Sequence, residues 1–523
     1  MNDSRWLMRR RQFLLSSLSV PAVAALLPGR VLAQAPDFLD LLTQEMQEKA
    51  QQPFEAPDRS LPEPFGSLGY DGYRQIQFDP ARALWQDGLP FRLSPFARGW
   101  LHNESVQLFV REDGASNPQS FASQDFLYHP PLDRAPFDAA PFPGIAGIKV
   151  TSPLNSPEIW DELLTFLGAS YFRALGQGSS YGTSARGIAI DTAAGKPEEF
   201  PRFTRFYAVR PQPTDNAVVI YATLEGPSVT GAYRFITRPG ANTVMDVTAR
   251  LFFRADITRL GVAPLTSMFL YGGPNRTAFD DHRGQVHDSE GLKIIRQNGE
   301  EVWRNLNNPN QLAASFYAEE NPRAFGLMQR TRRFLDYSDA EAHYERRPSV
   351  LVEPKAAWGK GHVCLIEIPT EREVNDNIVC FWIPDAPVVA GGSYEFAYRI
   401  TWGDMVEDAT RLARVAEFSA GNSGTSGSDA VRGQRKFVVD FAGPYIEAIA
   451  DEETVQPVMT IANGEVVHSA FRRVTGEGLW RFVADVRSTG DEPVEISVYI
   501  AFGDKRVSET WSYQWRPGDD DAH

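Results

Sequence analysis

The sequence predicts an all-β protein, with a large β-sandwich domain followed by a smaller, immunoglobulin-like β-sandwich domain. Short β-rich runs dominate the 523 residues, and 41 Gly and 37 Pro residues separate them. Runs of this length and spacing are typical of sandwiches rather than of alternating α/β folds. A break in composition near the C-terminus divides the chain into the two predicted units.

Periodicity places individual strands and one helix. Residues 245–251 and 394–400 alternate apolar and polar side chains, as strands with one buried face do. Residues 218–224 and 363–368 are continuous apolar runs, which indicates strands buried on both faces. Apolar residues at helical spacing predict a helix over residues 38–51.

The break in composition lies at residues 419–428, which are rich in Gly and Ser and poor in apolar residues. This composition predicts a linker. We therefore expect a large domain over 36–415, a linker over 416–434 and an immunoglobulin-like domain over 435–518. The large block is too long for a simple sandwich and should contain several sheets. The strands predicted after the break cover residues 437–441, 458–461, 480–486 and 494–502.

The first 33 residues have the pattern of an export signal. Arg10 and Arg11 precede Phe13 and Leu14 in the twin-arginine order, and a short apolar run leads to Ala33. Ser and Pro interrupt this run, which is too short to cross about 30 Å of hydrocarbon as a stable helix. We expect twin-arginine export, cleavage after Ala33 and a periplasmic protein without membrane insertion. An uncleaved amphipathic anchor is the alternative.

The charge of the chain argues against two classes of partner. Residues 1–33 contain five Arg and one Asp, so the predicted mature chain has 47 basic and 66 acidic residues and a net charge of −19. This charge would repel a nucleic acid or an anionic lipid surface. A neutral substrate is compatible with it, and the 12% of aromatic residues suits either large cores or surfaces that stack on sugars.

The two cysteines, Cys364 and Cys380, lie in strand-like runs that a polar loop separates. A hairpin centred near residues 371–374 would place them nearly opposite each other on one face. Both a periplasmic disulfide and two buried free thiols are compatible with this placement.

Two polar patterns give weak signals for other chemistry. Residues 178–182 match the Gly-x-Ser-x-Gly pattern of serine hydrolases, but the residues that follow predict a strand instead of the required helix. The same loop lacks the Lys-Ser/Thr ending of a phosphate-binding loop. The Asp and His residues at 280–282 and 287–288 follow no recognised spacing of metal ligands. We therefore expect no metal and no cofactor.

Two aspartates stand in settings that suit acid–base chemistry. Asp376 directly precedes a hydrophobic strand, and Asp288 follows His287. Glycoside hydrolysis commonly needs one carboxyl group to protonate the leaving oxygen and a second to activate water. Turn aspartates that hydrogen-bond their own backbone are the alternative for both, and the residues alone favour that alternative.

Four longer motifs occur in order along the chain. They are Tyr-Asp-x-Tyr-Arg-x-Ile-x-Phe at 70–78, Ser-Tyr-Phe-Arg-Ala at 170–174, Asn-Asp-Asn-Ile-Val-x-Phe-Trp at 375–382 and Arg-Lys-Phe-Val-Val-Asp-Phe at 435–441. With them the chain resembles the family of periplasmic glucan biosynthesis proteins G and D, over essentially the whole predicted mature chain. The twin-arginine signal favours the D branch.

The resemblance implies that the partner and substrate is osmoregulated periplasmic glucan, a β-1,2-linked glucose polymer. It implies a galactose-mutarotase-like β-sandwich joined to an immunoglobulin-like domain. The implied activity is that of an endo-β-1,2-glucanase that inverts the anomeric carbon. An open cleft edge in such a sandwich is compatible with a homodimer.

The resemblance also assigns roles to residues. Asp376 falls on the family's general acid and Asp288 on its general base. Tyr344 falls on a tyrosine beside the active-site cleft, where it would bind substrate or relay a proton together with Arg347. The acid must stay protonated at working pH, so its pKa should lie above its usual value near 4.

Two tryptophans are candidates for stacking on glucose rings. We assign Trp358 to substrate binding, and a core position is the alternative for it. Trp382 fits a core position better.

Two further functions are compatible with the same resemblance. An inverting transglycosylase would pass the glucan to a sugar hydroxyl and cyclise it. A non-catalytic factor would bind glucan or assist a membrane glucan synthase in assembly. Normal glucan production by an Asp376→Asn protein would favour the non-catalytic factor.

Overall fold

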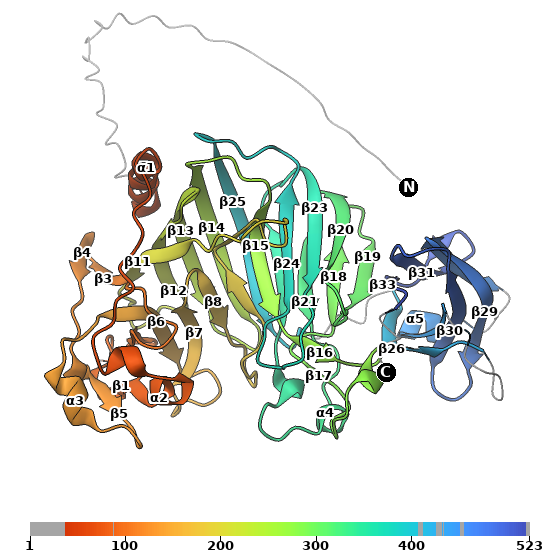
Figure 1. Ribbon diagram of the computed structural model, residues 1–523, viewed down its shortest axis with the longest axis horizontal. Coiled ribbons are helices and arrows are strands. Elements are labelled where there is room, and N and C mark those ends of the chain that lie inside the picture. Colours follow the sequence, from red (N-terminus) through yellow and green to blue (C-terminus); the bar gives the residue numbers. More distant parts are fainter. Residues whose placement is uncertain are drawn as a thin grey trace, which may run out of the picture.

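Strands dominate the computed structural model, which describes residues 37–86, 88–405, 412–424, 431, 433–449 and 454–518 (Figure 1). The all-β prediction is confirmed. The predicted export signal lies outside the described residues, as do residues 425–430 of the predicted linker. No described helix is long and apolar enough to span a membrane.

Two large sheets face each other and enclose the main core. Aromatic rings from both sheets meet there: the rings of Phe172 and Phe235 lie 5.2 Å apart, and those of Phe166 and Phe203 lie 5.8 Å apart. The first sheet consists, in order, of β2 (Arg92–Ala97), β6 (Ile145–Ser152), β7 (Asp161–Leu167), β8 (Tyr171–Ala174), β9 (Ser184–Arg186), β15 (Leu260–Ser267), β24 (Ile378–Pro384), β23 (Lys360–Glu367) and β20 (Ala313–Glu320), with β10 (Ile188–Ile190) paired to β15.

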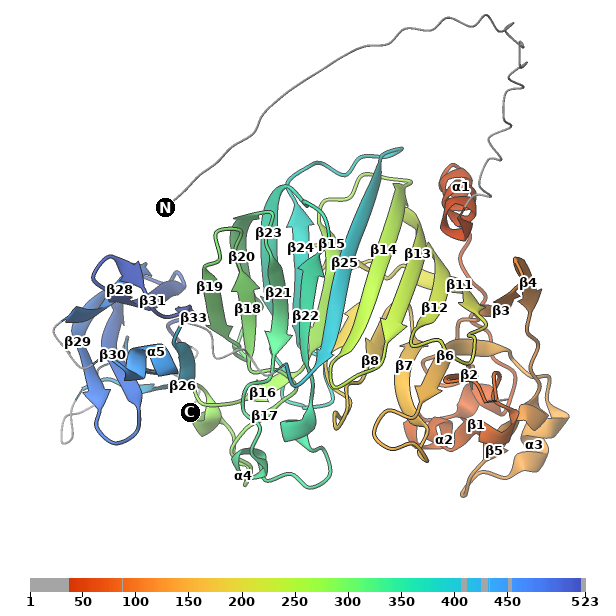
Figure 2. The same cartoon turned by 180° about the vertical axis from the view of Figure 1, so that it is seen from behind.

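The second sheet is larger and continues beyond the sandwich (Figure 2). It consists, in order, of β28 (Val455–Ala462), β31 (Val494–Phe502), β33 (Thr510–Trp515), β19 (Glu301–Asn305), β18 (Gly291–Ile295), β21 (Ala324–Met328), β22 (Ser349–Pro354), β25 (Ser393–Gly403), β14 (Thr243–Phe253), β13 (Val229–Arg238), β12 (Val218–Glu225), β11 (Arg202–Val209), β3 (Gln107–Glu112) and β4 (Ala115–Pro118), with β32 (Lys505–Arg506) paired to β31.

The two runs predicted from alternation pair with each other in β14 and β25. Met245 lies opposite Ile400, and both are buried, whereas Asp246 lies opposite Arg399 on the other face of the sheet. The Arg399 Nε donates to the Asp246 carboxylate at 2.9 Å. Apolar side chains thus face the core and an ion pair faces outward, which is the alternation that predicted both strands. The other predicted strands and the helix are confirmed as well.

Short elements cover the ends of the sandwich. Figures 1 and 2 show the small elements of the N-terminal part at one end of the molecule, the C-terminal strands at the other, and the β16–β17 pair with α4 below the ends of the long strands. These elements are α1 (Phe38–Ala50), α2 (Tyr70–Arg74), α3 (Arg134–Ala139), α4 (Phe334–Tyr337), α5 (Pro444–Glu447), the two-stranded pairs β1 (Ile76–Phe78) with β5 (Phe126–Tyr128) and β16 (Phe269–Tyr271) with β17 (Val286–His287), and the 3-10 turns at Phe65–Ser67, Pro80–Arg82, Ser123–Asp125, Arg276–Ala278 and Tyr344–Arg346.

The smaller C-terminal unit shares a sheet with the large one. Strand β33 pairs in parallel with β19, so Trp511 lies opposite Trp303. The second core contains both tryptophans. The C-terminal strands therefore extend the large sheet. The remaining sheet of this unit consists of β26 (Arg414–Asn422), β27 (Gln434–Ala442), β30 (Leu479–Ser488) and β29 (Gly464–Val474).

Part of the predicted linker is a strand. β26 pairs with β27, and its residues Val415 and Phe418 are buried in the C-terminal core. The linker prediction is therefore wrong for residues 416–422. Low apolar content indicated a flexible segment, but a strand that buries only one face needs few apolar residues.

The cysteines lie on opposite faces of the β23–β24 hairpin. Cys364 pairs with Phe381, and Leu365 pairs with Cys380. The hairpin was predicted correctly, but a shift of one residue in register turns a side chain to the other face. The prediction that the two cysteines share a face is therefore wrong, and both are buried free thiols. Burial raises the pKa of the Cys364 thiol to about 12.

The free thiols can be counted chemically. Denatured without reductant, the protein should react with two equivalents of a thiol reagent, and the native protein should react with almost none because both side chains are inaccessible. A thiol titration with mass detection measures this number. A denatured protein that reacts only after reduction would show a disulfide instead.

Candidate active site

The side chain of Asn377 holds the candidate acid in place. Asn377 is buried, its Oδ1 accepts from the Phe269 backbone N–H at 2.8 Å, and its Nδ2 donates to the carbonyl oxygens of Phe269 at 2.9 Å and Ile368 at 3.0 Å. The Ile368 N–H also donates to the Asn377 carbonyl at 2.9 Å, so backbone pairing closes the loop 368–377 and the Asn377 side chain attaches it to β16. Asp376 immediately precedes Asn377, so it lies beside this point of attachment.

The candidate base, Asp288, is attached to the same part of the structure through strand β17. β17 pairs with β16 through Phe269 opposite His287, and the Asp288 N–H donates to the Met268 carbonyl at 2.8 Å. Asp288 and Asp376 are therefore both attached at β16, although 88 positions separate them in sequence. Their charges interact, because Asp376 contributes to raising the pKa of Asp288.

Buried amides fix the backbone on which Asp288 lies. The His287 ring lies 2.9 Å from Gln329 Oε1 through Nδ1 and 3.0 Å from Gln285 Oε1 through Nε2. Gln329 Nε2 also donates to the carbonyl oxygens of His287 and Tyr344, at 2.9 and 3.1 Å. Burial lowers the pKa of His287 to about 3, so the ring is neutral and has a structural role.

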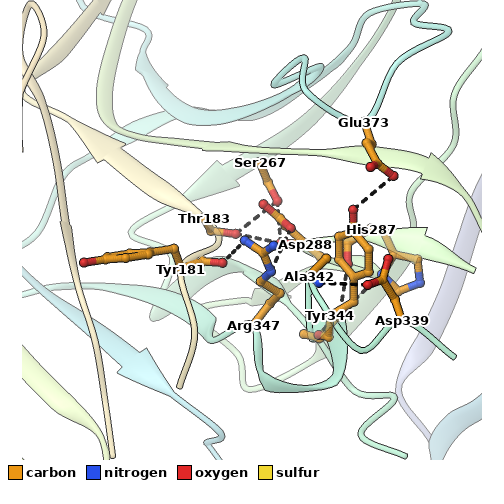
Figure 3. Close-up of polar contacts among 12 residues, drawn as sticks. Tyr181, Thr183, Ser267, His287, Asp288, Asp339, Ala342, Tyr344, Arg347 and Glu373 are labelled. Carbon is orange, nitrogen blue, oxygen red and sulfur yellow. Dashed lines mark hydrogen bonds and ion pairs between the residues drawn. The ribbon is translucent and has the colours of Figure 1, made fainter. Parts of the chain in front are cut away.

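The Asp288 carboxyl group is buried beside Arg347 (Figure 3). It is 8% exposed, and its Oδ1 lies 3.5 Å from Arg347 Nε. Burial raises the pKa of Asp288 to about 6, against the opposing effect of Arg347. Within the described part of the chain, Oδ1 is buried and accepts no hydrogen bond, and Arg347 is its charged partner.

The loop 178–182, which matched the serine-hydrolase pattern, holds the side chain of Arg347 in position. Arg347 Nη1 donates to the Tyr181 carbonyl (Figure 3). A Cβ atom at Gly182 would lie 3.1 Å from the Arg347 Cβ, so a glycine permits this close approach. Strand β9 follows the loop where a serine hydrolase would need a helix.

Two arginines that the sequence analysis did not single out face Asp376. Asp376 is solvent-accessible, yet the surrounding protein desolvates it enough to raise its pKa, while Arg186, Arg173 and Arg347 act in the opposite direction. Arg173 lies on β8 and Arg186 on the paired strand β9. Arg186 donates to Thr266 and to Glu198, at 2.8 and 2.7 Å, which holds its guanidinium group in place.

Tyr344 connects the Asp288 side of the site to the Asp376 loop. Its ring is buried, and its hydroxyl donates to Glu373 Oε2 at 3.3 Å (Figure 3). Arg283 Nη1 also contacts Glu373, at 2.8 Å. Glu373 and Asp376 share the loop 368–377, so these contacts restrict the position of the candidate acid. Burial, followed by the charges of Glu373 and Asp288, raises the pKa of Tyr344.

Three buried hydroxyl groups lie beside Asp288. Thr183, Ser267 and Ser289 hydrogen-bond one another at 2.8 to 3.0 Å. They come from the segment before β9, from the end of β15 and from the residue after Asp288. The cluster joins these segments without placing a charge in the core, since each hydroxyl can donate to the next.

The assignment of Trp358 to substrate binding is wrong. Trp358 is buried among core rings, 5.6 Å from Phe396 and 6.1 Å from Trp382. Trp382 lies near the end of β24 that is remote from Asp376, and it is fully buried, as predicted. The sequence could not reveal this, because aromatic side chains serve cores and sugar sites equally well.

Of the residues at 280–282, which were considered as metal ligands, Asp281 forms an ion pair. Arg283 donates to both carboxylate oxygens of Asp281, which holds the pKa of that carboxyl group below its usual value. Among the described residues, no three His, Cys, Asp or Glu side chains lie close enough together to hold a metal ion.

Comparison with known proteins identifies the family. A model of the family described as "Periplasmic glucan biosynthesis protein, MdoG" matches residues 38–515. The chain belongs to this family. The glucans biosynthesis protein G of Cereibacter sphaeroides is 48% identical over 492 residues, which cover 93% of this chain and 91% of the relative. That of Bradyrhizobium diazoefficiens is 40% identical over 518 residues, 98% of this chain and all of the relative.

A third relative, the glucans biosynthesis protein G of Shewanella sp. strain MR-4, is 39% identical over 468 residues, 89% of this chain and 84% of the relative. These relatives bear the name of the G protein, so they do not support the preference for the D branch. The family resemblance seen in the motifs is confirmed.

The buried carboxyl group of Asp288 should reduce stability at neutral pH. Its pKa is about 6 in the fold and near 3.8 in the unfolded chain, so stability falls as the pH rises from about 4 to about 6, and the full cost remains above pH 6. Asp288→Asn removes this cost. At pH 8 the variant should be more stable than the parent by about 3 kcal/mol, from roughly two pKa units at 1.36 kcal/mol each.

Denaturant unfolding of parent and Asp288→Asn at pH 4 and pH 8 measures this difference. The advantage of the variant should be present at pH 8 and small at pH 4. A variant no more stable than the parent at pH 8 would contradict the burial of this charge.

Proposed function

We propose that the protein is a periplasmic enzyme that cleaves β-1,2-glucan with inversion of the anomeric carbon. Asp376 is the general acid and Asp288 the general base. The observation that carries the proposal is the attachment of two aspartates, remote in sequence, to one short strand, with the pKa of both raised. Perturbed carboxyl groups of this kind mark candidates for catalysis.

The environments of the two aspartates suit different roles. A raised pKa keeps Asp376 protonated to a higher pH, so that it can give its proton to the leaving glycosidic oxygen. Asp288, with a pKa of about 6, is ionised at neutral pH, so its carboxylate can act as a base toward water. Tyr344 and Arg347 would bind the sugar or extend the path of that proton.

The resemblance to a glucan biosynthesis family supports the substrate class, because the relatives are named for glucans. The same residues would serve an inverting transglycosylase that cyclises the glucan, with a sugar hydroxyl in place of water. A glucan-binding factor that assists a glucan synthase would need neither carboxyl group. The products formed and the effect of replacing Asp376 distinguish these functions.

Removal of the general acid should abolish cleavage. With linear β-1,2-glucan, the mature protein should release shorter chains that carry the added mass of water, and Asp376→Asn should reduce the rate by at least about 100-fold, the usual contribution of acid–base catalysis. Asp385→Asn is a matched control, because Asp385 follows the opposite end of β24 and is exposed. Mass spectrometry and a reducing-end assay measure the products.

The other possible results of this assay distinguish the alternative functions. Products without added water would indicate cyclisation or transfer by the same carboxyl groups. Absence of any product from the unaltered protein would contradict the proposed enzyme and favour the binding factor. Equal loss of rate in Asp385→Asn would mean that the effect of Asp376→Asn is not specific.

The proposed location in the periplasm is supported by the family name and by the export pattern at Arg10 and Arg11. Replacement of both arginines by lysine should prevent twin-arginine export, and the uncleaved chain should accumulate in the cytoplasm. Cell fractionation with immunoblotting tests this outcome. Efficient export of the double variant would contradict the twin-arginine route.

A further inference from the structure

Arg173 reaches the candidate active site from the first sheet. The residues before and after it in β8 are buried in the core, so the alternation of the strand turns Arg173 to the other face. β8 and β9 are antiparallel, with Phe172 opposite Ala185. The next step along these strands therefore brings Arg173 toward Thr183, whose hydroxyl group belongs to the cluster beside Asp288 (Figure 3).

The charge of Arg173 acts on both candidate carboxyl groups. Burial raises the pKa of Asp288 and of Asp376, and Arg173 is one of the cations that limit the rise for each. For Asp376 this effect opposes the protonated state that a general acid needs. Adjustment of the acid therefore does not explain an arginine at this position.

The N–H groups of Arg173 are available to a ligand. The side chain is half-buried and stacks on the ring of Tyr181, with its Cζ 4.3 Å from the ring centroid. Within the described part of the chain, its guanidinium group donates no hydrogen bond and forms no ion pair. The neighbouring Arg186, in contrast, is bonded to Thr266 and Glu198. A guanidinium group has five N–H donors, so a bound molecule with oxygen acceptors would find donors here.

The charges around Arg173 favour a neutral acceptor over an anion. The carboxyl groups of Asp288 and Asp376 lie within reach of the same arginine, and in ionised form they would repel an anionic ligand. The hydroxyl, ring and glycosidic oxygens of a sugar accept hydrogen bonds without this repulsion. A polyhydroxylated neutral ligand therefore suits the position better than a phosphate or a carboxylate.

We propose that Arg173 is a substrate-binding residue, which donates hydrogen bonds to oxygens of the glucose units on either side of the bond to be cleaved. The identity of the ligand rests on the proposed function. The bond to be cleaved must lie between the acid and the base, and the charge of Arg173 reaches both. The ring of Tyr181 packs against the planar guanidinium group and so restricts the direction of its donors. A lysine would keep the charge but not this planar set of donors.

Binding can be measured without turnover in the Asp376→Asn protein, in which a neutral amide replaces the protonated acid. Isothermal titration calorimetry with linear β-1,2-glucan would compare this background with Arg173→Met and Arg173→Lys, each added singly. Arg111→Met is the matched control. Arg111 is also half-buried and stacks on an aromatic ring, with its Cζ 3.4 Å from the centroid of Phe38, but it lies on β3 in the second sheet.

Both Arg173 variants should bind the glucan at least about tenfold more weakly, as the loss of a hydrogen bond from a charged donor predicts. Arg111→Met should bind within twofold of the background. Arg173→Lys keeps the charge and most of the apolar stem, so it decides the test even if Arg173→Met fails to fold.

Three other results would overturn the proposed role of Arg173. Full affinity in Arg173→Lys would mean that only the charge matters, and an equal loss in Arg111→Met would mean that the effect is not specific. Unchanged affinity in both Arg173 variants, while the background binds glucan, would exclude the residue from binding and leave the proposed function intact. No binding by the background would contradict both proposals.

Discussion

The arrangement of the candidate site depends on one buried side-chain amide. Asn377 hydrogen-bonds both backbone groups of Phe269 and the carbonyl of Ile368, so it attaches the end of a ten-residue loop to a three-residue strand. The partner strand of Phe269 leads directly to Asp288. Without this amide, the two buried backbone groups of Phe269 would lose these partners, at a cost of about 1–3 kcal/mol each. The segments that carry the two aspartates would then no longer be attached to the same strand.

Burial and nearby cations have opposite effects on the pKa of the two candidate carboxyl groups. Removal of water raises the pKa of Asp288 and Asp376, while Arg347 and Arg173 limit the rise for both. The ion pairs and hydrogen bonds of Glu373 with Arg283 and Tyr344 hold the loop from its exposed side. An ionised carboxyl group that is buried reduces the stability of the fold. The candidate site therefore has a stability cost, and acid–base chemistry can use the carboxyl groups that cause it.

Sequence patterns predicted strands such as β14 and β25, because burial of one sheet face imposes a period of two that is visible along the chain. The sequence pattern singled out Asp376 and Asp288, but their catalytic roles came only from the family resemblance, since a turn aspartate and a catalytic aspartate look alike in sequence. Asn377 was within a quoted motif, but its role depends on the distant β16. The register of Cys364 and Cys380 failed by one residue, because loop length alone does not determine pairing.

The most direct test of the acid–base pair is the stereochemistry of the first product. Proton NMR during cleavage of linear β-1,2-glucan follows the anomeric signals before mutarotation equilibrates them. A pair that activates water on the face opposite to the leaving group should give the α-anomer first. Initial appearance of the β-anomer would mean retention, which requires a covalent intermediate or its equivalent and would contradict the roles assigned to Asp376 and Asp288.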